Sequence, residues 1–318
     1  MRAEDTLFRT IVDVPKWQNP MQPHEQFVLL GSCFAQNIGE RFQGYGLQVT
    51  CNPLGVTYNP ESIALQVEQA LAPKGEPPIF QATGEWRCWW AGTLIGAADR
   101  EACGEVSQGA FSLLENALRS ADRLFITLGT NVCYKLRESG LTVANCHKMP
   151  GGLFEEVALD LDCCTDALDR TVQLLAKECP QMQIIFTVSP YRYAKYGYHG
   201  SQLAKATLLL AVERMCQKHH DRVSYFPAYE IVMDELRDYR FYADDMIHPS
   251  PAAVNYIWQR LRESAMSTAM QQYLDEYEPV RRALLHRPQG NMTPAYAKFR
   301  HDMEQRGQEL RKKYSPTP

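Results

Sequence analysis

The stretch Phe27–Ala35 has the sequence FVLLGSCFA, and it predicts how the rest of the chain is arranged. Four apolar residues lead into Gly31, which allows a sharp turn of the backbone. Apolar side chains then recur at Phe34, Ile38 and Phe42, which is the spacing of one face of a helix. The stretch therefore predicts a buried strand, a tight turn and the start of a helix.

Two nucleophilic side chains, Ser32 and Cys33, follow this turn at the predicted start of the helix. The unpaired amide groups and the dipole of a helix favour an anion at its N-terminus, and a thiolate is such an anion. The simpler interpretation is a capping serine followed by a buried cysteine. Residues near the other end of the chain bear on the choice between the two.

The composition indicates a globular protein with a sizeable core. The chain has 318 residues, 45% of them hydrophobic, and a formal net charge of −4. It contains no block of basic residues, so nucleic acid is not an expected partner. There is no run of about 18 apolar residues, so we expect no membrane-spanning segment. The polar residues 1–25 do not resemble a secretory signal.

The ten cysteines lie in apolar runs as often as in loops. This distribution favours free thiols in a reducing compartment over a disulfide framework, so we expect a soluble, cytoplasmic protein. The spacing of Cys133, Cys146 and His147 fits no zinc pattern well, and no metal is expected. No glycine-rich nucleotide-binding motif is present, so no cofactor is expected either.

Apolar runs begin near residues 27, 47, 124, 184 and 223, and segments with helical periodicity separate most of them. Alternating strands and helices predict βαβ units and a parallel sheet. Residues 73–104 are predicted to be irregular, and residues 132–136 fit either a strand or a helix. The predicted helices span residues 34–43, 61–71, 107–120, 161–178, 202–219, 228–236, 251–273 and 296–313.

We predict three parts of the chain. Residues 1–25 form an N-terminal arm, kept extended by its prolines. Residues 26–275 form the α/β domain. Residues 276–318 form a C-terminal helical extension that packs on the domain or on a partner.

Ligands of an open parallel sheet bind outside the carboxyl ends of its strands, where several polar or small residues are predicted to lie. These residues are Ser32, Cys33, Gly55, Gly129, Thr130, Asn131 and Ser189. In the loop before the last long helix of the domain, Asp245 and His248 stand three residues apart. We expect all of these groups to converge on one crevice.

This combination is typical of nucleophilic catalysis. A thiol or hydroxyl needs a base, and His248 can serve as that base while the Asp245 carboxylate orients its ring. The backbone N–H of Cys33, the N–H of Gly55 and the side-chain amide of Asn131 can stabilise an oxyanion. Each signal alone is more often a loop or a turn, but their order and their placement at strand ends make the combination moderately specific.

The chain resembles the GSCFA family, whose namesake residues stand here at positions 31–35, and through it the SGNH (GDSL-like) hydrolases. The resemblance covers about residues 8–260, with similar segments at 52–55, 128–130, 145–148, 187–190 and 229–250. It implies an α/β fold, a flavodoxin-like three-layer sandwich with a central parallel sheet of about five strands. In the SGNH pattern a Gly-Asp-Ser carries the nucleophile, a later Gly and Asn help form the oxyanion hole, and Asp-x-x-His completes the triad. The matching positions here are Gly55, Asn131, Asp245 and His248.

The nucleophile departs from the SGNH pattern. Aligned without gaps, Gly-Asp-Ser falls on residues 31–33, which puts Cys33 at the nucleophile position and Ser32 where an Asp usually stands. A shift by one residue would make Ser32 the nucleophile. We favour Cys33, because the ungapped alignment and the helix N-terminus agree on it. Tyr193 stands where the resemblance leads us to expect a histidine, so we expect substrate handling to differ.

Further polar residues are candidates for substrate binding. Lys148 and Arg192 could each meet an acidic group of a substrate. The full set of predicted substrate-binding residues is Gly129, Thr130, His147, Lys148, Ser189 and Arg192.

The leading hypothesis is an esterase or acyltransferase of the SGNH type that acts through a covalent acyl-enzyme. By resemblance, an O-acylated carbohydrate or another small-molecule ester is the expected substrate, and a homo-oligomer is left open. The alternative is a non-catalytic ligand-binding module on a degenerate SGNH scaffold, although the intact pair of Asp245 and His248 argues against it. A redox sensor based on Cys33 is less favoured, because no resolving cysteine is evident nearby in the sequence.

Overall fold

The central sheet has five parallel strands. The computed structural model describes residues 10–82, 84–286 and 293–315. Hydrogen bonding orders the strands β11-β10-β6-β1-β2, which is the 2-1-3-4-5 order of flavodoxin-like folds when they are numbered among themselves. Their bounds are β1 (Gln26–Gly31), β2 (Gln48–Cys51), β6 (Arg123–Leu128), β10 (Gln183–Val188) and β11 (Val223–Tyr225). The predicted parallel α/β fold is confirmed.

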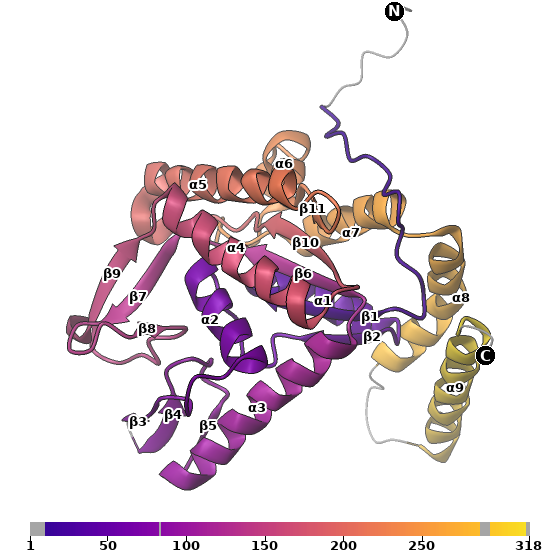
Figure 1. The fold of residues 1–318 in the computed structure, drawn as a ribbon. Coiled ribbons are helices and arrows are strands. Elements are labelled where there is room, and N and C mark those ends of the chain that lie inside the picture. Colours follow the sequence, from indigo (N-terminus) through magenta and orange to yellow (C-terminus); the bar gives the residue numbers. More distant parts are fainter. Residues whose placement is uncertain (1–9, 83, 287–292, 316–318) are drawn as a thin grey trace, which may run out of the picture.

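Helices cover both faces of this sheet (Figure 1). Along β1, Val28 and Leu30 join one core cluster, whereas Phe27 and Leu29 join the other, as expected of a strand buried on both faces. The first cluster includes side chains of α2 (Pro60–Leu71), α3 (Arg100–Ser120), α4 (Leu161–Glu178) and α5 (Gly197–Lys218). The second includes side chains of α1 (Cys33–Gly44), α7 (Pro251–Ala265), α8 (Thr268–Leu285) and α9 (Pro294–Lys313).

Two small antiparallel sheets are inserted into this framework. The segment 73–104, predicted to be irregular, contains β3 (Ile79–Ala82), β4 (Glu85–Cys88) and β5 (Gly96–Ala97). Residues 132–136, for which the sequence fitted either a strand or a helix, form the strand β7 (Val132–Leu136). This strand pairs with β8 (Thr142–Val143) and β9 (Phe154–Ala158). These strands are two to five residues long, too short for a clear alternating pattern in the sequence.

Two further predictions of helices are corrected. The helix α3 begins at Arg100 rather than at residue 107, because the Asp99 carboxylate accepts the Ala102 N–H at 2.8 Å and caps it. The region predicted as a helix over 228–236 is a short α6 (Ala228–Glu230) followed by a π-helical turn over Ile231–Glu235.

The predicted helix over 251–273 is wrong in one respect, because it is interrupted after Ala265. The Met21 N–H donates to the Ala265 oxygen at 2.7 Å, and the Ser267 N–H donates to the Met21 oxygen at 3.0 Å. The N-terminal arm thus bonds backbone groups that a continuous helix would use. The Ser267 hydroxyl then accepts the Met270 N–H at 3.0 Å and caps α8.

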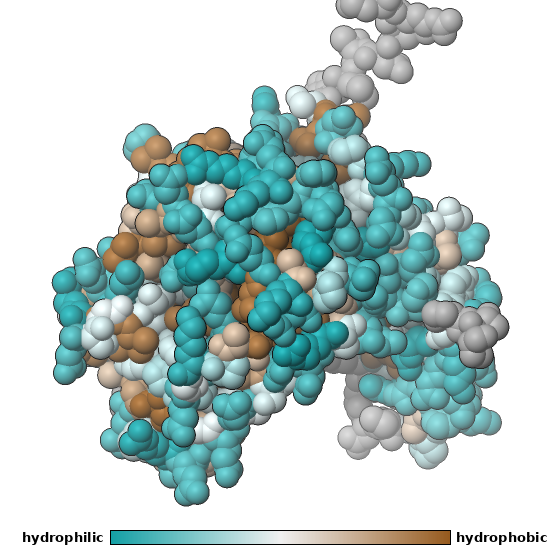
Figure 2. All heavy atoms as spheres, in the orientation of Figure 1, coloured by the Kyte–Doolittle hydropathy of each residue, from teal (hydrophilic) through white to brown (hydrophobic). Residues whose placement is uncertain are grey.

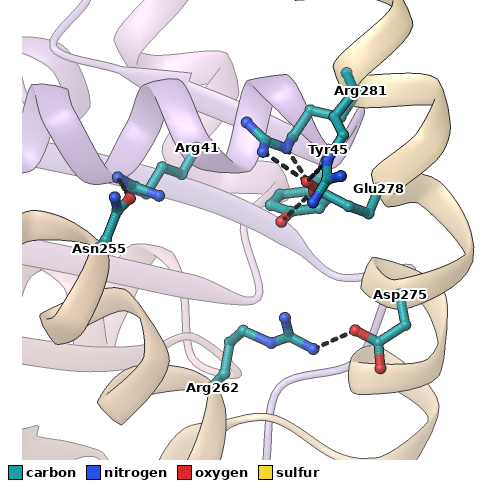
Figure 3. A network of polar contacts seen from close by, with 8 residues as sticks. Arg41, Tyr45, Asn255, Arg262, Asp275, Glu278 and Arg281 are labelled. Atoms are coloured by element: carbon teal, nitrogen blue, oxygen red, sulfur yellow. Dashed lines mark hydrogen bonds and ion pairs between the residues drawn. The ribbon is translucent and has the colours of Figure 1, made fainter. Parts of the chain in front are cut away.

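The second of these helices, α8, continues through residue 275 and packs on α1 (Figure 3). The Tyr45 hydroxyl donates to Glu278 Oε2 at 2.8 Å, and Arg281 pairs with the same carboxylate at 2.7 Å. A second link joins Arg262 of α7 to Asp275 at 2.7 Å. The start of the predicted C-terminal extension is therefore attached to the α/β domain by charged and apolar contacts.

The surface in Figure 2 is mainly hydrophilic, with separate apolar areas. Leu203 and Leu210 of α5 are among the exposed apolar side chains. None of the helices in the described part of the chain is long and apolar enough to cross a membrane.

The hydrogen bonds and ion pairs of Glu278 lead to a prediction about how the stability of the fold changes at acid pH. The Arg281 guanidinium, more than the other neighbours, lowers the pKa of Glu278 from 4.5 to about 2. The ionised carboxylate therefore stabilises the fold above about pH 4.5, and this contribution is lost as the pH falls toward 2. We expect Glu278→Gln to lower the free energy of unfolding at pH 7, and by progressively less between pH 4.5 and 2.

Urea unfolding at each pH measures this change in stability. Glu263→Gln is the matched control, because Glu263 is 67% exposed and lies 3.7 Å from its arginine partner. An equal loss of stability for Glu278→Gln at pH 7 and pH 2.5 would contradict the role assigned to Glu278.

Candidate active site

The turn between β1 and α1 requires glycine at position 31. Gly31 has a φ of +125°, and a Cβ there would lie 2.1 Å from the Thr127 carbonyl oxygen on the neighbouring strand β6. The Ser32 N–H donates to that same oxygen at 3.1 Å, and the Gly31 N–H donates to Asn52 Oδ1 at 2.9 Å. These contacts fix the direction in which the chain leaves β1, and α1 begins only two residues after Gly31.

Ser32 and Cys33 have different surroundings at this turn. Ser32 is 2% exposed, and its hydroxyl accepts the Phe34 N–H at 3.3 Å as the helix cap. Cys33 is half-buried, and its Sγ lies 3.7 Å from the Tyr58 hydroxyl. Its backbone N–H belongs to the first turn of α1, where a helix leaves such donors unpaired. The thiol is thus the more accessible of the two nucleophiles.

Asp245 and His248 form the predicted pair. His248 Nδ1 lies 2.5 Å from Asp245 Oδ2, while Asp245 Oδ1 accepts the N–H groups of Ile247 and His248 at 2.9 Å each. Hydrogen bonds from the His248 backbone and ring, and then from Ile247, lower the pKa of Asp245 to about 2. The carboxylate is therefore ionised at neutral pH. It orients the ring through Nδ1, and this leaves Nε2 for proton transfer.

Tyr191 lies against this pair. Its ring packs on the His248 ring with centroids 4.4 Å apart, and the Arg192 N–H donates to the Ile247 oxygen at 3.0 Å. Burial raises the pKa of Tyr191, and the Asp245 carboxylate raises it further, so the phenol stays neutral. In this conformation no hydrogen bond joins Cys33 to His248 among the described residues.

The predicted substrate residues Gly129 and Thr130 hold the loop that carries Tyr58. Their N–H groups donate to the Tyr58 oxygen at 2.7 and 3.1 Å. A Cβ at position 129 would lie 3.3 Å from the Tyr58 Cβ, so glycine permits this close approach. Both N–H groups are engaged inside the protein, and Thr130 is 2% exposed. We therefore reassign these two residues from substrate contact to the placement of Tyr58.

The predicted oxyanion donors differ in whether their hydrogens are already bonded within the protein. The Gly55 N–H donates to the Asn52 oxygen at 2.8 Å in a turn, so that donor is occupied. Asn131 is 9% exposed, and its Nδ2 donates one hydrogen to the Leu159 oxygen at 2.7 Å. An amide has two such hydrogens, so one is left for a ligand. The Cys33 N–H and the Asn131 amide therefore remain as donors, whereas Gly55 does not in this conformation.

Among the described residues, no contact joins His147 or Lys148 to Cys33, Tyr58 or His248. The His147 ring is buried against Phe80 and Trp89, with centroids 5.3 and 5.9 Å apart, and its Nε2 lies 3.0 Å from the Cys88 oxygen. Burial lowers the pKa of His147, so the imidazole is neutral at pH 7. Lys148 next to it is exposed. Burial of the His147 ring argues against its predicted contact with substrate, whereas substrate binding by the exposed Lys148 stays a prediction.

Sequence reasoning singled out Tyr193 and missed Tyr58 and Tyr191, two other rings of a tyrosine cluster that begins beside the thiol. Tyr58 and Tyr193 pack edge to face at 6.3 Å, and Tyr193 also contacts Tyr191 at 5.3 Å and stacks on Tyr196 at 5.4 Å. Burial raises the pKa of Tyr193 to about 12 and that of Tyr58 above its ordinary value, so both remain neutral phenols. The available signal was the Tyr-x-Tyr sequence after Ser189-Pro190.

The family comparison can be set beside this geometry. A family model described as the GSCFA family matches residues 26–261, more than half of the chain. This chain belongs to the GSCFA family. A comparison with curated proteins gave no significant match.

Solved structures similar to this GSCFA protein share little sequence with it. A putative platelet activating factor from Streptococcus pneumoniae is 12% identical with a TM-score of 0.40, covering 76% of this chain and 84% of that one. An acetyl esterase mutant with an acetate ion is 10% identical with a TM-score of 0.38, covering 79% and 99%. The acetyl xylan esterase Est2A from Butyrivibrio proteoclasticus is 13% identical with a TM-score of 0.40, covering 77% and 65%.

No group of three or more His, Cys, Asp or Glu side chains in the described ranges is placed to hold a metal ion. All ten cysteines are free thiols.

A buried lysine ties two strand ends of this GSCFA protein together. Lys205 is 1% exposed, and its Nζ donates to the Gly129 oxygen at 2.6 Å and to the Ser189 oxygen at 2.7 Å. These carbonyls lie just beyond the ends of β6 and β10. Burial, and after it the Arg192 charge, lower the pKa of Lys205 to about 7. Ser189 itself is fully buried, and its hydroxyl accepts the Tyr191 N–H at 3.3 Å, so Ser189 positions Tyr191 from within the protein.

We expect Lys205→Met to lower the free energy of unfolding by about 3 kcal/mol. Two buried carbonyls would lose their donor, and each unsatisfied group costs roughly 1–3 kcal/mol. Urea unfolding at pH 7 measures the loss. The control is Lys218→Met on the same helix, where the lysine is 54% exposed and a change of about 0.5 kcal/mol or less is expected. Equal effects of the two substitutions would refute the role of Lys205.

Proposed function

We propose that this GSCFA protein is an ester hydrolase or acyltransferase that forms a thioester with its substrate at Cys33. One observation carries the proposal. The half-buried Cys33 thiol stands at a helix N-terminus, 3.7 Å from the Tyr58 hydroxyl. From Tyr58, ring contacts run through Tyr193 and Tyr191 to the Asp245-bound His248. The neighbouring Ser32 is buried and already used as a cap. These contacts support the assignment of Cys33 as nucleophile, His248 as base and Asp245 as the carboxylate that orients the ring.

The reaction has two halves. In the first, His248 Nε2 takes the thiol proton as Sγ attacks the ester carbonyl carbon, and His248 then gives the proton to the departing alcohol. In the second, a water or an alcohol loses a proton to His248 and attacks the thioester, which releases an acid or a new ester and returns the proton to Sγ. Asp245 keeps its charge throughout and holds the ring.

The tetrahedral intermediates need hydrogen-bond donors. The Cys33 N–H and the second amide hydrogen of Asn131 are the groups that we assign to the oxyanion. Cys33 and His248 are not hydrogen-bonded in this conformation, and catalytic hydrogen bonds often shorten only when substrate binds. A rotation of the Cys33 side chain from Tyr58 toward His248 is therefore part of the proposal.

The tyrosines support an O-acylated carbohydrate as the substrate. The rings of Tyr58, Tyr193 and Tyr196 offer apolar faces that can pack on the C–H groups of a sugar, while phenol hydroxyls can bond to its hydroxyls. The site also contains no cationic group beside Cys33 among the described contacts, which suits a neutral substrate.

The nucleophile can be tested with 4-nitrophenyl acetate. We expect Cys33→Ala and His248→Ala to lower kcat/KM by at least about 100-fold, the scale of a lost nucleophile or base. The matched control is Ser32→Ala, which should keep its activity within a few-fold while losing about 1 kcal/mol of stability as a removed helix cap. Mass spectrometry of the wild type should find an acetyl group on the peptide that contains Cys33.

Two outcomes would contradict the proposal. If Ser32→Ala is inactive and Cys33→Ala is active, the nucleophile is the hydroxyl. If neither substitution changes the rate and no acyl-enzyme forms, the pocket serves ligand binding without catalysis. Circular dichroism of each folded variant separates these results from misfolding.

A further inference from the structure

A second concave site adjoins the loop that carries His248. It is a cleft of about 480 Å³, which we name the Arg192 cleft, and this volume is within the range of small-molecule sites. Most of its lining residues come from residues 232–242, which follow α6 in the chain (α6 is labelled in Figure 1), and Met246 of the Asp245–His248 loop also lines it. Its lining includes Arg192, Val232, Met233, Leu236, Tyr242 and Met246.

The walls of the Arg192 cleft are mainly apolar. Val232, Met233 and Leu236 come from the π-helical turn and the residue after it, and Tyr242 and Met246 come from the loop opposite. Met246 is 48% exposed and has a φ of +56°, so its side chain stands at a sharp bend of the loop. An apolar body of a ligand would be shielded from water between these two segments.

Arg192 brings a positive charge into this apolar setting without an acidic partner. Its Nη1 contacts three neutral acceptors, namely Gln202 Oε1 at 2.8 Å, the Tyr229 hydroxyl at 3.2 Å and Met233 Sδ at 3.7 Å. No carboxylate lies within ion-pair distance of it among the described residues. Lys205, which is buried and does not line the cleft, donates its hydrogen bonds to the Gly129 and Ser189 carbonyl oxygens.

The other charged groups of the cleft are already engaged. Arg237 pairs with Asp234 at 3.0 Å. The Asp238 carboxylate accepts the Arg240 N–H at 2.9 Å and lies 3.7 Å from the Arg240 guanidinium. Arg192 is therefore the charged group of the cleft that is left to recognise a ligand.

We propose that the Arg192 cleft binds a carboxylate attached to an apolar body, such as a short aliphatic or aromatic chain. The carboxylate bonds to guanidinium nitrogens of Arg192, and the body packs against Met233, Tyr242 and Met246. A guanidinium presents donors in a planar fork that matches a carboxylate. This site is separate from the thiol and does not depend on the function proposed for Cys33.

Equilibrium binding of 4-phenylbutyrate and of its neutral amide tests the proposal, with affinities from NMR titration of the full chain. We expect the wild type to bind the acid about tenfold more tightly than the amide, the scale of a charged hydrogen bond. Arg192→Met should abolish this preference. Arg237→Met, which removes a paired arginine from the same cleft, should keep it, and Cys33→Ala should bind as the wild type does.

A second pair of variants tests the charge without touching Arg192. Tyr239 lines the rim and is 79% exposed, so substitutions there should leave the fold intact. Tyr239→Glu should weaken binding of the acid but not of the amide, whereas Tyr239→Gln should change neither. The proposal is overturned if the wild type binds neither compound or binds both equally, or if the preference survives Arg192→Met or is lost in Arg237→Met.

Discussion

The close contact between Gly31 and the Thr127 carbonyl oxygen is the constraint on which the candidate site depends. No side chain fits at position 31, because a Cβ there would lie 2.1 Å from that oxygen. Glycine also adopts the φ of +125° that the turn needs. With the Ser32 N–H fixed on the same oxygen, α1 starts at Cys33 beside strand β6. Cys33, the proposed nucleophile, is therefore placed by backbone geometry rather than by contacts of its side chain.

The other parts of the site are joined to this turn through strand ends. Gly129 and Thr130, just beyond β6, hold the Tyr58 carbonyl, and the Tyr58 hydroxyl reaches Cys33. Ser189, just beyond β10, binds the Tyr191 N–H, and Tyr191 packs on the His248 ring. The Lys205 amino group donates to the Gly129 and Ser189 carbonyl oxygens and so joins the two strand ends. Residues distant in sequence thus form one hydrogen-bonded frame around the thiol.

The sheet and its main helices could be predicted because their signals are local. Apolar runs such as residues 27–30 and 124–128 predict buried strands. Asp245 and His248 are only three residues apart, so both could be assigned to one loop. The inserted strands were missed because a strand such as Gly96–Ala97 is too short to carry a pattern. The break after Ala265 was missed because its cause is Met21, more than 200 residues away.

The same distinction applies to the site. Cys33, Asp245 and His248 could be proposed from the sequence because they lie at predicted turns and loops. Gly129 was predicted to bind substrate because it follows a strand. The sequence does not reveal that its N–H donates to the Tyr58 carbonyl oxygen. His147 looked like a polar loop residue, although it is buried against Trp89. Lys205 was missed, since a lysine inside a helix pattern is ordinarily exposed.

The central claim is that His248 activates the Cys33 thiol, and iodoacetamide labelling of all ten cysteines tests it most directly. Labelling rates are read by peptide mass spectrometry at several pH values, in the wild type and in His248→Ala. Cys163 is exposed and serves as the internal reference. The account predicts that Cys33 at pH 7 reacts faster than Cys163, and that His248→Ala slows Cys33 but not Cys163. A Cys33 that reacts no faster than Cys163 and is unaffected by His248→Ala would contradict it.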